Sequence, residues 1–187
     1  KAPDIAKRYA AYFENNRRRV RERLEKIPQA ARLKVYLASG APLSTSGRPS
    51  RNQDWMDLGG AINVAENWFH DRPNASGTAL LENVVASDPD VIITLRASDV
   101  EAIRNSAQWS MIKAVRNGRV YANPRGMFWW CRETSEEALQ FLWVAKLLYP
   151  DVFADIDMVV ETRAFYKDFY RIDLSDDEVK EFLSPSE

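Results

Sequence analysis

Three short apolar runs, separated by segments that carry helix-start signals, restrict this chain to few folds. The runs are "LKVYLA" (33–38), "DVIITL" (90–95) and "RVYA" (119–122). Short runs rich in β-branched residues are typical of strands buried on both faces of a parallel sheet. Because helices separate these runs, the pattern predicts an α/β fold with a mostly parallel sheet.

The helix starts are read from capping signals. Segments 98–101 (Ser-Asp-Val-Glu), 134–137 (Thr-Ser-Glu-Glu) and 175–178 (Ser-Asp-Asp-Glu) each fit a capping box, and Thr78 fits a further cap. Asn117-Gly118 predicts the turn into the third strand.

The N-terminal segment predicts one long helix that ends at Pro28. Pro3 suits a first helical turn, and apolar residues recur at helical spacing from Ile5 to Ile27. About 24 residues at 1.5 Å each span roughly 35 Å, the width of a small domain. We therefore expect a spacer helix followed by a Rossmann-like, three-layer lobe.

The basic run "NNRRRVRER" (15–23) within that helix does not indicate nucleic-acid binding. Glutamates stand four residues from several of its arginines, which predicts a solvated, ion-paired face. The whole chain has 26 basic and 27 acidic residues among 187, so a broad basic surface is excluded.

Other classes are excluded by what the sequence lacks. No apolar run approaches the roughly 18 residues of a membrane span. Cys131 is the only cysteine, which rules out an intrachain disulfide and a multi-cysteine metal site. The chain opens "KAPDIAKRY" without an initiator methionine, and we expect an excised fragment.

Open α/β sheets bind ligands beyond the carboxyl ends of their strands. The segments expected there are 39–52, 96–98 and 123–133, and the last contains "MFWWCR" (127–132). Adjacent tryptophans point in different directions on any regular element, so at least one of the pair should face something other than the core. Aromatic faces and the arginines of these loops suit a bulky, partly flat, anionic ligand.

Signatures of catalysis are absent from the sequence. There is no G-x-G-x-x-G, Walker A or G-x-S-x-G motif, and His70 is the only histidine. Cys131 beside Arg132 could be a nucleophile of lowered pKa, but a lone cysteine is more often inert, and we expect an inert one. We predict a binding protein without a cofactor, the alternatives being an α/β enzyme domain that uses a nucleotide or other cofactor and a purely structural interaction domain.

The order of four motifs resembles a known family. "GGAINVA" (59–65), "DPDVII" (88–93), "AVRNGRVY" (114–121) and "LLYPDVF" (147–153) are similar to the C-terminal part of ABC-importer substrate-binding proteins for ferric siderophores, haem and cobalamin. The resemblance implies that residues 1–28 are the inter-lobe helix and residues 29–187 the C-terminal lobe. The N-terminal lobe would then be absent from this chain.

The resemblance also implies a mechanism. A monomeric protein, periplasmic or lipid-anchored on the outer face of the cytoplasmic membrane, would capture an iron chelate between two lobes. It would deliver the chelate to a permease dimer in the membrane. Glu82 matches the carboxylate with which the C-terminal lobe docks on that permease, although a glutamate in a first helical turn also simply favours the helix dipole.

The family resemblance suggests the ligand contacts. It implies that Arg96 and Arg51 pair with the chelate, although ordinary salt bridges are equally open to both. Trp130 matches an aromatic that points into the cleft. Trp129 is a second candidate ligand contact, with inward packing as the alternative.

Two further candidates carry alternatives. Arg132 could contact the ligand or pair with Glu133 or Glu136. His70 lies in a loop where some relatives supply an iron ligand, and an exposed loop histidine is the other interpretation. No direct metal ligand is assigned. Many relatives read Ser-Pro-Glu where this chain has Thr134-Ser135-Glu136.

Overall fold

The computed structural model describes residues 2–186 and is built on four parallel strands. In space they follow the order β3-β1-β5-β6, with these bounds: β1 Lys34–Ala38, β3 Ile62–Asn63, β5 Val91–Thr94 and β6 Val120–Ala122. The three predicted strands are confirmed. The sequence pattern missed β3, because a strand of two residues has no periodicity to read.

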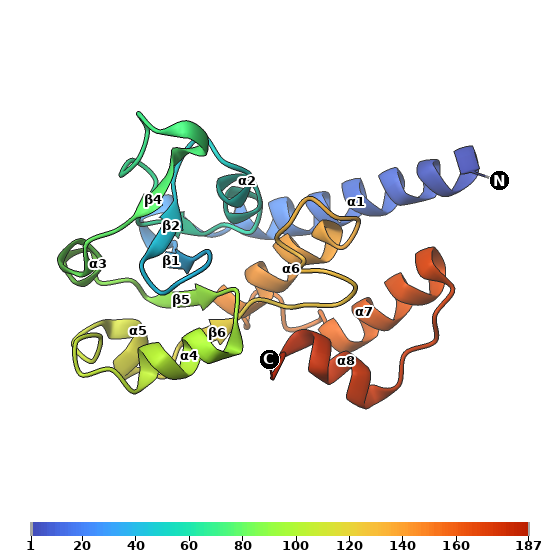
Figure 1. Cartoon of the computed structure of the whole chain (residues 1–187). Helices are drawn as coiled ribbons and strands as arrows, with labels where there is room; N and C mark the ends of the chain where they lie inside the picture. Colours follow the sequence, from blue (N-terminus) through green and yellow to red (C-terminus); the bar gives the residue numbers. More distant parts are fainter. Residues whose placement is uncertain (1, 187) are drawn as a thin grey trace.

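Alternate residues of the strands enter two separate cores. Val35 and Leu37 of β1 belong to a first core, whereas Tyr36 and Ala38 belong to a second core on the other face. Helices α2 (Arg51–Leu58) and α6 (Glu137–Leu148) cover the first face; α3 (Leu81–Ser87), α4 (Ala97–Arg104) and α5 (Lys113–Arg116) cover the second (Figure 1). The predicted three-layer α/β lobe is therefore confirmed.

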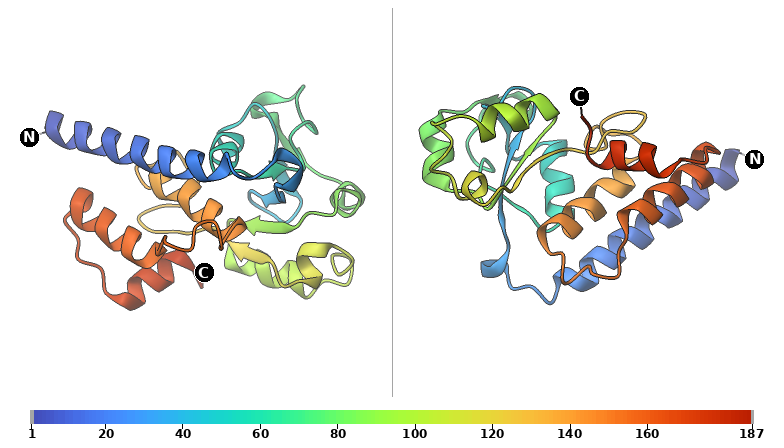
Figure 2. Two further views of the ribbon diagram at one scale, coloured as in Figure 1. Left: turned by 180° about the vertical axis from the view of Figure 1, so that it is seen from behind. Right: turned by 90° about the horizontal axis from the view of Figure 1, so that it is seen from below.

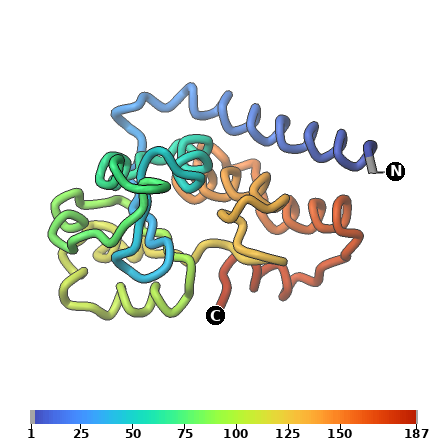
Figure 3. Tube along the Cα trace, turned by 45° about the horizontal axis from the view of Figure 1, so that its top comes forward, coloured from blue at the N-terminus to red at the C-terminus, as the bar shows by residue number. Residues whose placement is uncertain are grey.

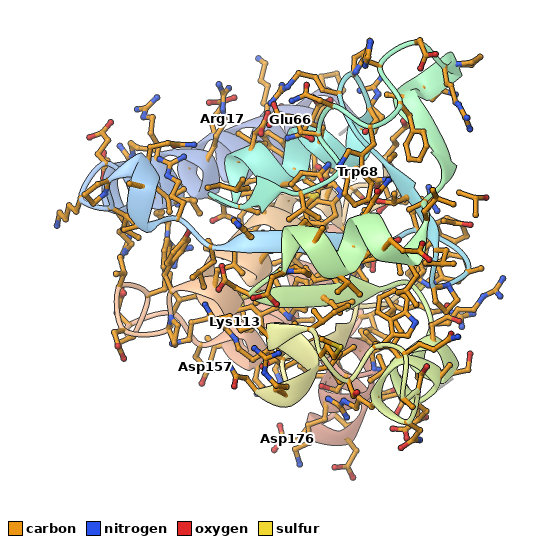
Figure 4. The ribbon with its side chains drawn as sticks, turned by 90° about the vertical axis from the view of Figure 1, so that its left-hand side faces the viewer. Arg17, Glu66, Trp68, Lys113, Asp157 and Asp176 are labelled. Carbon is orange, nitrogen blue, oxygen red and sulfur yellow. The ribbon has the colours of Figure 1, made fainter. Side chains whose placement is uncertain are left out.

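Tyr36 is the centre of an aromatic group in the second core. Its ring lies 6.3 Å from that of Trp68 and 6.0 Å from that of Trp109, centre to centre. In Figure 4, Trp68 lies above the central strands and Lys113 of α5 lies below them. Residues from both flanks of the sheet thus meet on one central strand.

The N-terminal helix α1 (Ala2–Leu24) runs alongside α6 and α7 (Met158–Phe165), as both views of Figure 2 show. Aromatic rings join them: Phe13 and Phe141 lie 5.3 Å apart, and Tyr12 and Phe165 lie 5.5 Å apart. The predicted long helix is confirmed, although it ends four residues before Pro28.

The chain after α7 turns back through a π-helical segment, η3 (Tyr166–Tyr170), into α8 (Asp176–Leu183). Of the predicted caps, only Ser175 is confirmed: its hydroxyl accepts from the Glu178 N–H, and the Glu178 side chain accepts from the Ser175 N–H. The other three are wrong. Arg96 and Glu136 precede α4 and α6, and Thr78 lies in a strand. The helices begin one residue before Ser98 and three residues after Thr134.

The loop expected at 39–52 contains regular structure. Strand β2 (Ser44–Ser46) pairs with β4 (Ser76–Thr78) in a small antiparallel sheet, and short 3₁₀ turns η1 (Gln29–Ala31) and η2 (Pro73–Ala75) complete the fold. Within residues 2–186, no helix is both long and apolar enough to span a bilayer.

Candidate functional site

The strand order creates a point where connections diverge. From β1 the chain first crosses to β3 on one side and then to β5 on the other, so the segments after β1 and β5 part from each other. Ligands of open α/β sheets bind at such a point. The candidate site therefore lies where residues 39 and 95 leave the sheet.

The segment 123–136, here named the crossing loop, spans that point. The indole N–H of Trp129 donates to the carbonyl of Leu95 (2.9 Å), and the guanidinium of Arg132 donates to the carbonyl of Ser39 (3.4 Å). Figure 3 shows the loop as a yellow-to-orange excursion that leaves the sheet and returns to α6. One loop is thus bonded to the ends of both neighbouring strands.

The crossing loop borders two hollows. On one side lies a polar hollow of about 360 Å³, here the arginine pocket, whose lining comprises Ser50, Arg51, Asn52, Asn74, Ser76, Cys131, Arg132 and Glu133. On the other lies a larger hollow of about 990 Å³, the edge pocket, whose walls include Arg96, Arg104, Arg125, Trp129, Trp143 and Leu183. The structure thus brings Arg51 and Arg132 together, whereas Arg96 lies in the other hollow.

Donors dominate the arginine pocket. Two guanidinium groups, two amide side chains and two hydroxyls line it, which suits an anion with several oxygens. The carboxylate in the lining is that of Glu133, 3.2 Å from the Arg51 guanidinium, and both side chains of this pair are largely exposed. An exposed pair contributes little, about 0–1 kcal/mol, so an anion can displace it.

A buried polar network holds the start of α2, from which Arg51 projects. The Asn63 amide donates to the Gln53 side chain (2.8 Å) and to the Ser46 carbonyl (2.9 Å). The Asn52 amide donates to the Ser46 hydroxyl (2.9 Å), and Ser50 caps the helix by accepting from the Gln53 N–H. Satisfied buried networks of this kind fix geometry. The pocket wall is therefore rigid on this side.

Aromatic and cationic groups combine in the edge pocket. The Arg125 guanidinium lies 5.1 Å from the centre of the Trp129 ring, and Phe128 meets the same ring edge-on at 5.0 Å. Arg104 donates to the carbonyl of Val120 on the edge strand (2.7 Å). This hollow offers flat apolar walls with positive charge at the rim.

The prediction that Trp130 points into the cleft is wrong in this structure, whereas Trp129, the second predicted contact, borders a hollow. Trp130 is fully buried in the first core, where its indole N–H donates to Glu136 (3.1 Å). Trp129 is half-buried and lines the edge pocket. The two side chains point to opposite sides, as expected, but a buried acceptor 6 residues along the chain draws Trp130 inward.

Two other predicted residues lie apart from both hollows. His70 is exposed in the loop after β3, with a ring nitrogen 3.0 Å from the Asn67 carbonyl. Glu82 is exposed in the first turn of α3. Neither lines the arginine pocket or the edge pocket.

The titratable groups beside the arginine pocket favour binding over catalysis. Burial raises the pKa of the Cys131 thiol to about 12, so the thiol stays protonated at neutral pH. Burial also raises the pKa of Glu137, and the nearby Arg51 opposes that rise. Within residues 2–186, no cluster of three or more His, Cys, Asp or Glu side chains could hold a metal ion.

Sequence reasoning missed several residues of the site. Asn74 has a left-handed backbone (φ 54°) and reaches the arginine pocket from a turn that no pattern predicted. Asn52 follows Arg51 directly in α2, but adjacent helical residues point in different directions, so the sequence did not place both in one wall. Met127 and Phe128 are exposed on the crossing loop. The only sequence signal for these two residues was their strongly apolar character within a predicted loop.

Comparisons with known proteins agree on one group. The family model described as "Periplasmic binding protein" matches residues 1–125. The molybdate-binding protein MolA of Haemophilus influenzae is 32% identical over 159 residues, which cover 83% of this chain and 44% of MolA.

Solved structures give the same result. An ABC transporter solute binding protein from Sulfurospirillum deleyianum superimposes with a TM-score of 0.85 at 25% identity, covering 96% of this chain and 56% of that one. Molybdate-bound MolA of H. influenzae superimposes with a TM-score of 0.78 at 28% identity, covering 90% and 51%. The chain thus spans about half the length of the relatives that it matches.

Proposed function

The chain belongs to the periplasmic binding protein family, and on that premise we propose that it forms one lobe of the substrate-binding component of an ABC importer. Proteins of this family bind their ligands and do not transform them. Residues 29–187 would be the C-terminal lobe and residues 1–28 the helix that leads to a second lobe. The length of α1 and the half-length match to the relatives support this division.

The cargo that the site supports best is a small metal oxyanion of the molybdate type, held in the arginine pocket. The observation that carries this proposal is the convergence of Arg51, Arg132, Asn52 and Asn74 with two serine hydroxyls on one small polar hollow. Guanidinium forks and neutral donors can together satisfy the several acceptors of an oxyanion. MolA, the 32%-identical relative, is a molybdate-binding protein, which supports the same class of cargo.

An iron chelate, such as a ferric siderophore or haem, is the second candidate. Its support is the apolar side of the crossing loop, where Met127 and Phe128 are 63% and 47% exposed beside the Arg125–Trp129 stack. Large apolar side chains held in solvent suit an organic ligand with flat rings. In this case Arg96 in the edge pocket would pair with the anionic groups of the chelate.

Calorimetric titration of the full-length protein distinguishes the two cargoes. We expect saturable binding of molybdate and tungstate, with weaker binding of sulfate and phosphate. Arg51→Ala removes one charge-assisted contact and should weaken molybdate binding tenfold or more, since such a contact contributes roughly 1.5–3 kcal/mol. Arg18→Ala, an exposed arginine on α1, is the matched control.

Binding of an iron chelate in place of an oxyanion would favour the second candidate cargo. If no oxyanion binds but haemin or a ferric hydroxamate does, and Phe128→Ala weakens that binding, the arginine pocket is not the cargo site. Equal molybdate affinities for Arg51→Ala and wild type would also exclude this pocket.

The partner in the membrane would be a permease dimer, reached from the periplasm by a free or lipid-anchored protein. Glu82 is the proposed contact of this lobe, because it is exposed in the first turn of α3. An exposed carboxylate at a helix start can pair with arginines of a partner without losing a contact of its own fold.

A further inference from the structure

A single buried carboxylate organises the crossing loop. Glu136 is fully buried, and its oxygens accept hydrogen bonds from the N–H of Met127 (3.1 Å), the N–H of Phe128 (3.1 Å), the indole of Trp130 (3.1 Å) and the hydroxyl of Tyr166. A buried carboxylate is costly unless such donors surround it. Here all four donors are neutral, and three of them belong to the crossing loop.

The tyrosine that completes this set is held in its donating form. Burial raises the pKa of the Tyr166 hydroxyl, and its hydrogen bond to Glu136 raises that pKa further. The same oxygen accepts from the Met127 N–H at 3.0 Å. Tyr166 therefore connects the crossing loop to η3, a segment 30 residues beyond Glu136.

The backbone approaches this centre closely. A side chain at Gly126 would overlap the Tyr166 hydroxyl and the Glu136 carboxylate. The loop also closes on itself nearby, because Arg125 and Trp129 form an isolated antiparallel bridge and the Trp130 N–H donates to the Pro124 carbonyl (3.2 Å). The loop conformation is thus specified by the carboxylate at its centre.

The hydrogen bonds of Glu136 also determine which side chains of the crossing loop are exposed. Anchoring the backbone of Met127 and Phe128 holds both side chains in solvent and turns Trp130 inward. The residues that follow, Cys131 to Glu133, form one wall of the arginine pocket, while Trp129 forms a wall of the edge pocket. Both hollows share a wall whose shape depends on one internal side chain.

We propose that Glu136, which contacts neither hollow itself, is the positioning residue of the ligand site: it holds the crossing loop in the conformation that presents Arg132 and Trp129. The effect on ligand binding rests on the proposed function. The role of Glu136 in holding the crossing loop does not. Glutamine has the same size, yet its amide group would face four donors and could accept from fewer of them. Glu136→Gln should therefore release the loop without emptying the core.

The first test measures the loop without any ligand. Amide hydrogen exchange in the full-length protein should be at least tenfold faster at Met127 and Phe128 in Glu136→Gln than in wild type. Exchange at Ile92 and Ile93 in β5 should be unchanged, because those amides belong to the sheet. Tyr166→Phe, which keeps the carboxylate, is a milder variant and should give a smaller acceleration at the same two amides.

The second test measures molybdate binding by calorimetry. Glu136→Gln should weaken it about tenfold, with Tyr166→Phe in between. Glu161→Gln is the matched control: this carboxylate is also largely covered and pairs with Arg19 at 2.5 Å, away from both hollows. Its loss should lower stability and leave molybdate affinity unchanged.

The outcomes separate this inference from the proposed function. Unchanged exchange at Met127 and Phe128 in both variants, or faster exchange with unaltered molybdate affinity, would overturn the positioning role. If the wild-type protein binds no molybdate, the cargo proposal fails, and the exchange rates still decide whether Glu136 holds the loop.

Discussion

Glu133 competes at the rim of the arginine pocket with any anion that enters it. Its carboxylate lies 3.2 Å from the Arg51 guanidinium. Removing that negative charge frees Arg51 for the ligand and removes a repulsion. We predict that Glu133→Gln binds molybdate about threefold to tenfold more tightly at low ionic strength, with a smaller gain at high salt because the pair is exposed.

A matched exposed pair provides the control for that prediction. Glu14 lies 3.2 Å from Arg17 on α1, far from the pocket in sequence. Glu14→Gln changes the net charge of the protein by the same amount and should leave the affinity unchanged. Weaker molybdate binding by Glu133→Gln would mean that Glu133 orders the pocket and does not compete within it.

Cys131 lies in the wall of the arginine pocket, but its thiol is expected to be unreactive. Burial raises its pKa to about 12, so the reactive thiolate forms only as the pH approaches that value. We predict that iodoacetamide leaves the folded protein unmodified between pH 7 and pH 9 and alkylates it once denatured, as mass spectrometry would measure. Rapid alkylation of the native protein at pH 8 would contradict the buried placement.

At the scale of elements, one helix depends on its cap and another does not. Ser175 caps α8 with a reciprocal bond to Glu178, whereas Ser98 lies inside α4, one residue after its start. We predict that Ser175→Ala lowers the free energy of unfolding by about 1 kcal/mol. Ser98→Ala should change it by much less, and chemical denaturation measures both.

The same cap gives α8 a dependence on pH. Hydrogen bonds from the backbone and hydroxyl of Ser175 lower the pKa of Glu178 in the folded protein. A lowered folded-state pKa means that the stabilisation is present above the unfolded pKa and is lost as the pH falls through the folded one. The difference in stability between wild type and Ser175→Ala should therefore shrink below about pH 4. A constant difference down to pH 3 would exclude a contribution from the Glu178 carboxylate.

For the whole molecule, the decisive prediction concerns delivery to the membrane. Helix α3, which carries Glu82, lies at the opposite side of the lobe from the N-terminal end of α1 (Figure 1). We predict that Glu82→Ala leaves molybdate affinity unchanged but lowers uptake and binding to the permease at least fivefold. Asp151→Ala, an exposed carboxylate in the turn after α6, is the control. Wild-type uptake by the Glu82 variant would remove this residue from the docking surface.

Elements whose signals are local could be predicted from the amino-acid sequence. Apolar runs specified β1, β5 and β6, because a buried strand needs consecutive apolar residues. Helical spacing from Ile5 onwards specified α1, and the loops after the strands pointed to the edge of the sheet where the candidate site lies. Arg51 and Arg132 could be named as candidate site residues for the same reason.

How that edge is built depends on contacts that the fold creates. The sequence required the two tryptophans to diverge, but the nearby carboxylate of Glu136, which accepts from the hydroxyl of the distant Tyr166, selects Trp130 for the core. Likewise α4 and α6 do not begin at their predicted caps: Arg96 and Glu136 precede them instead of Ser98 and Thr134. The periodicity of a strand can be read from residues adjacent in the chain. Burial and hydrogen-bond satisfaction depend on residues that the fold brings together.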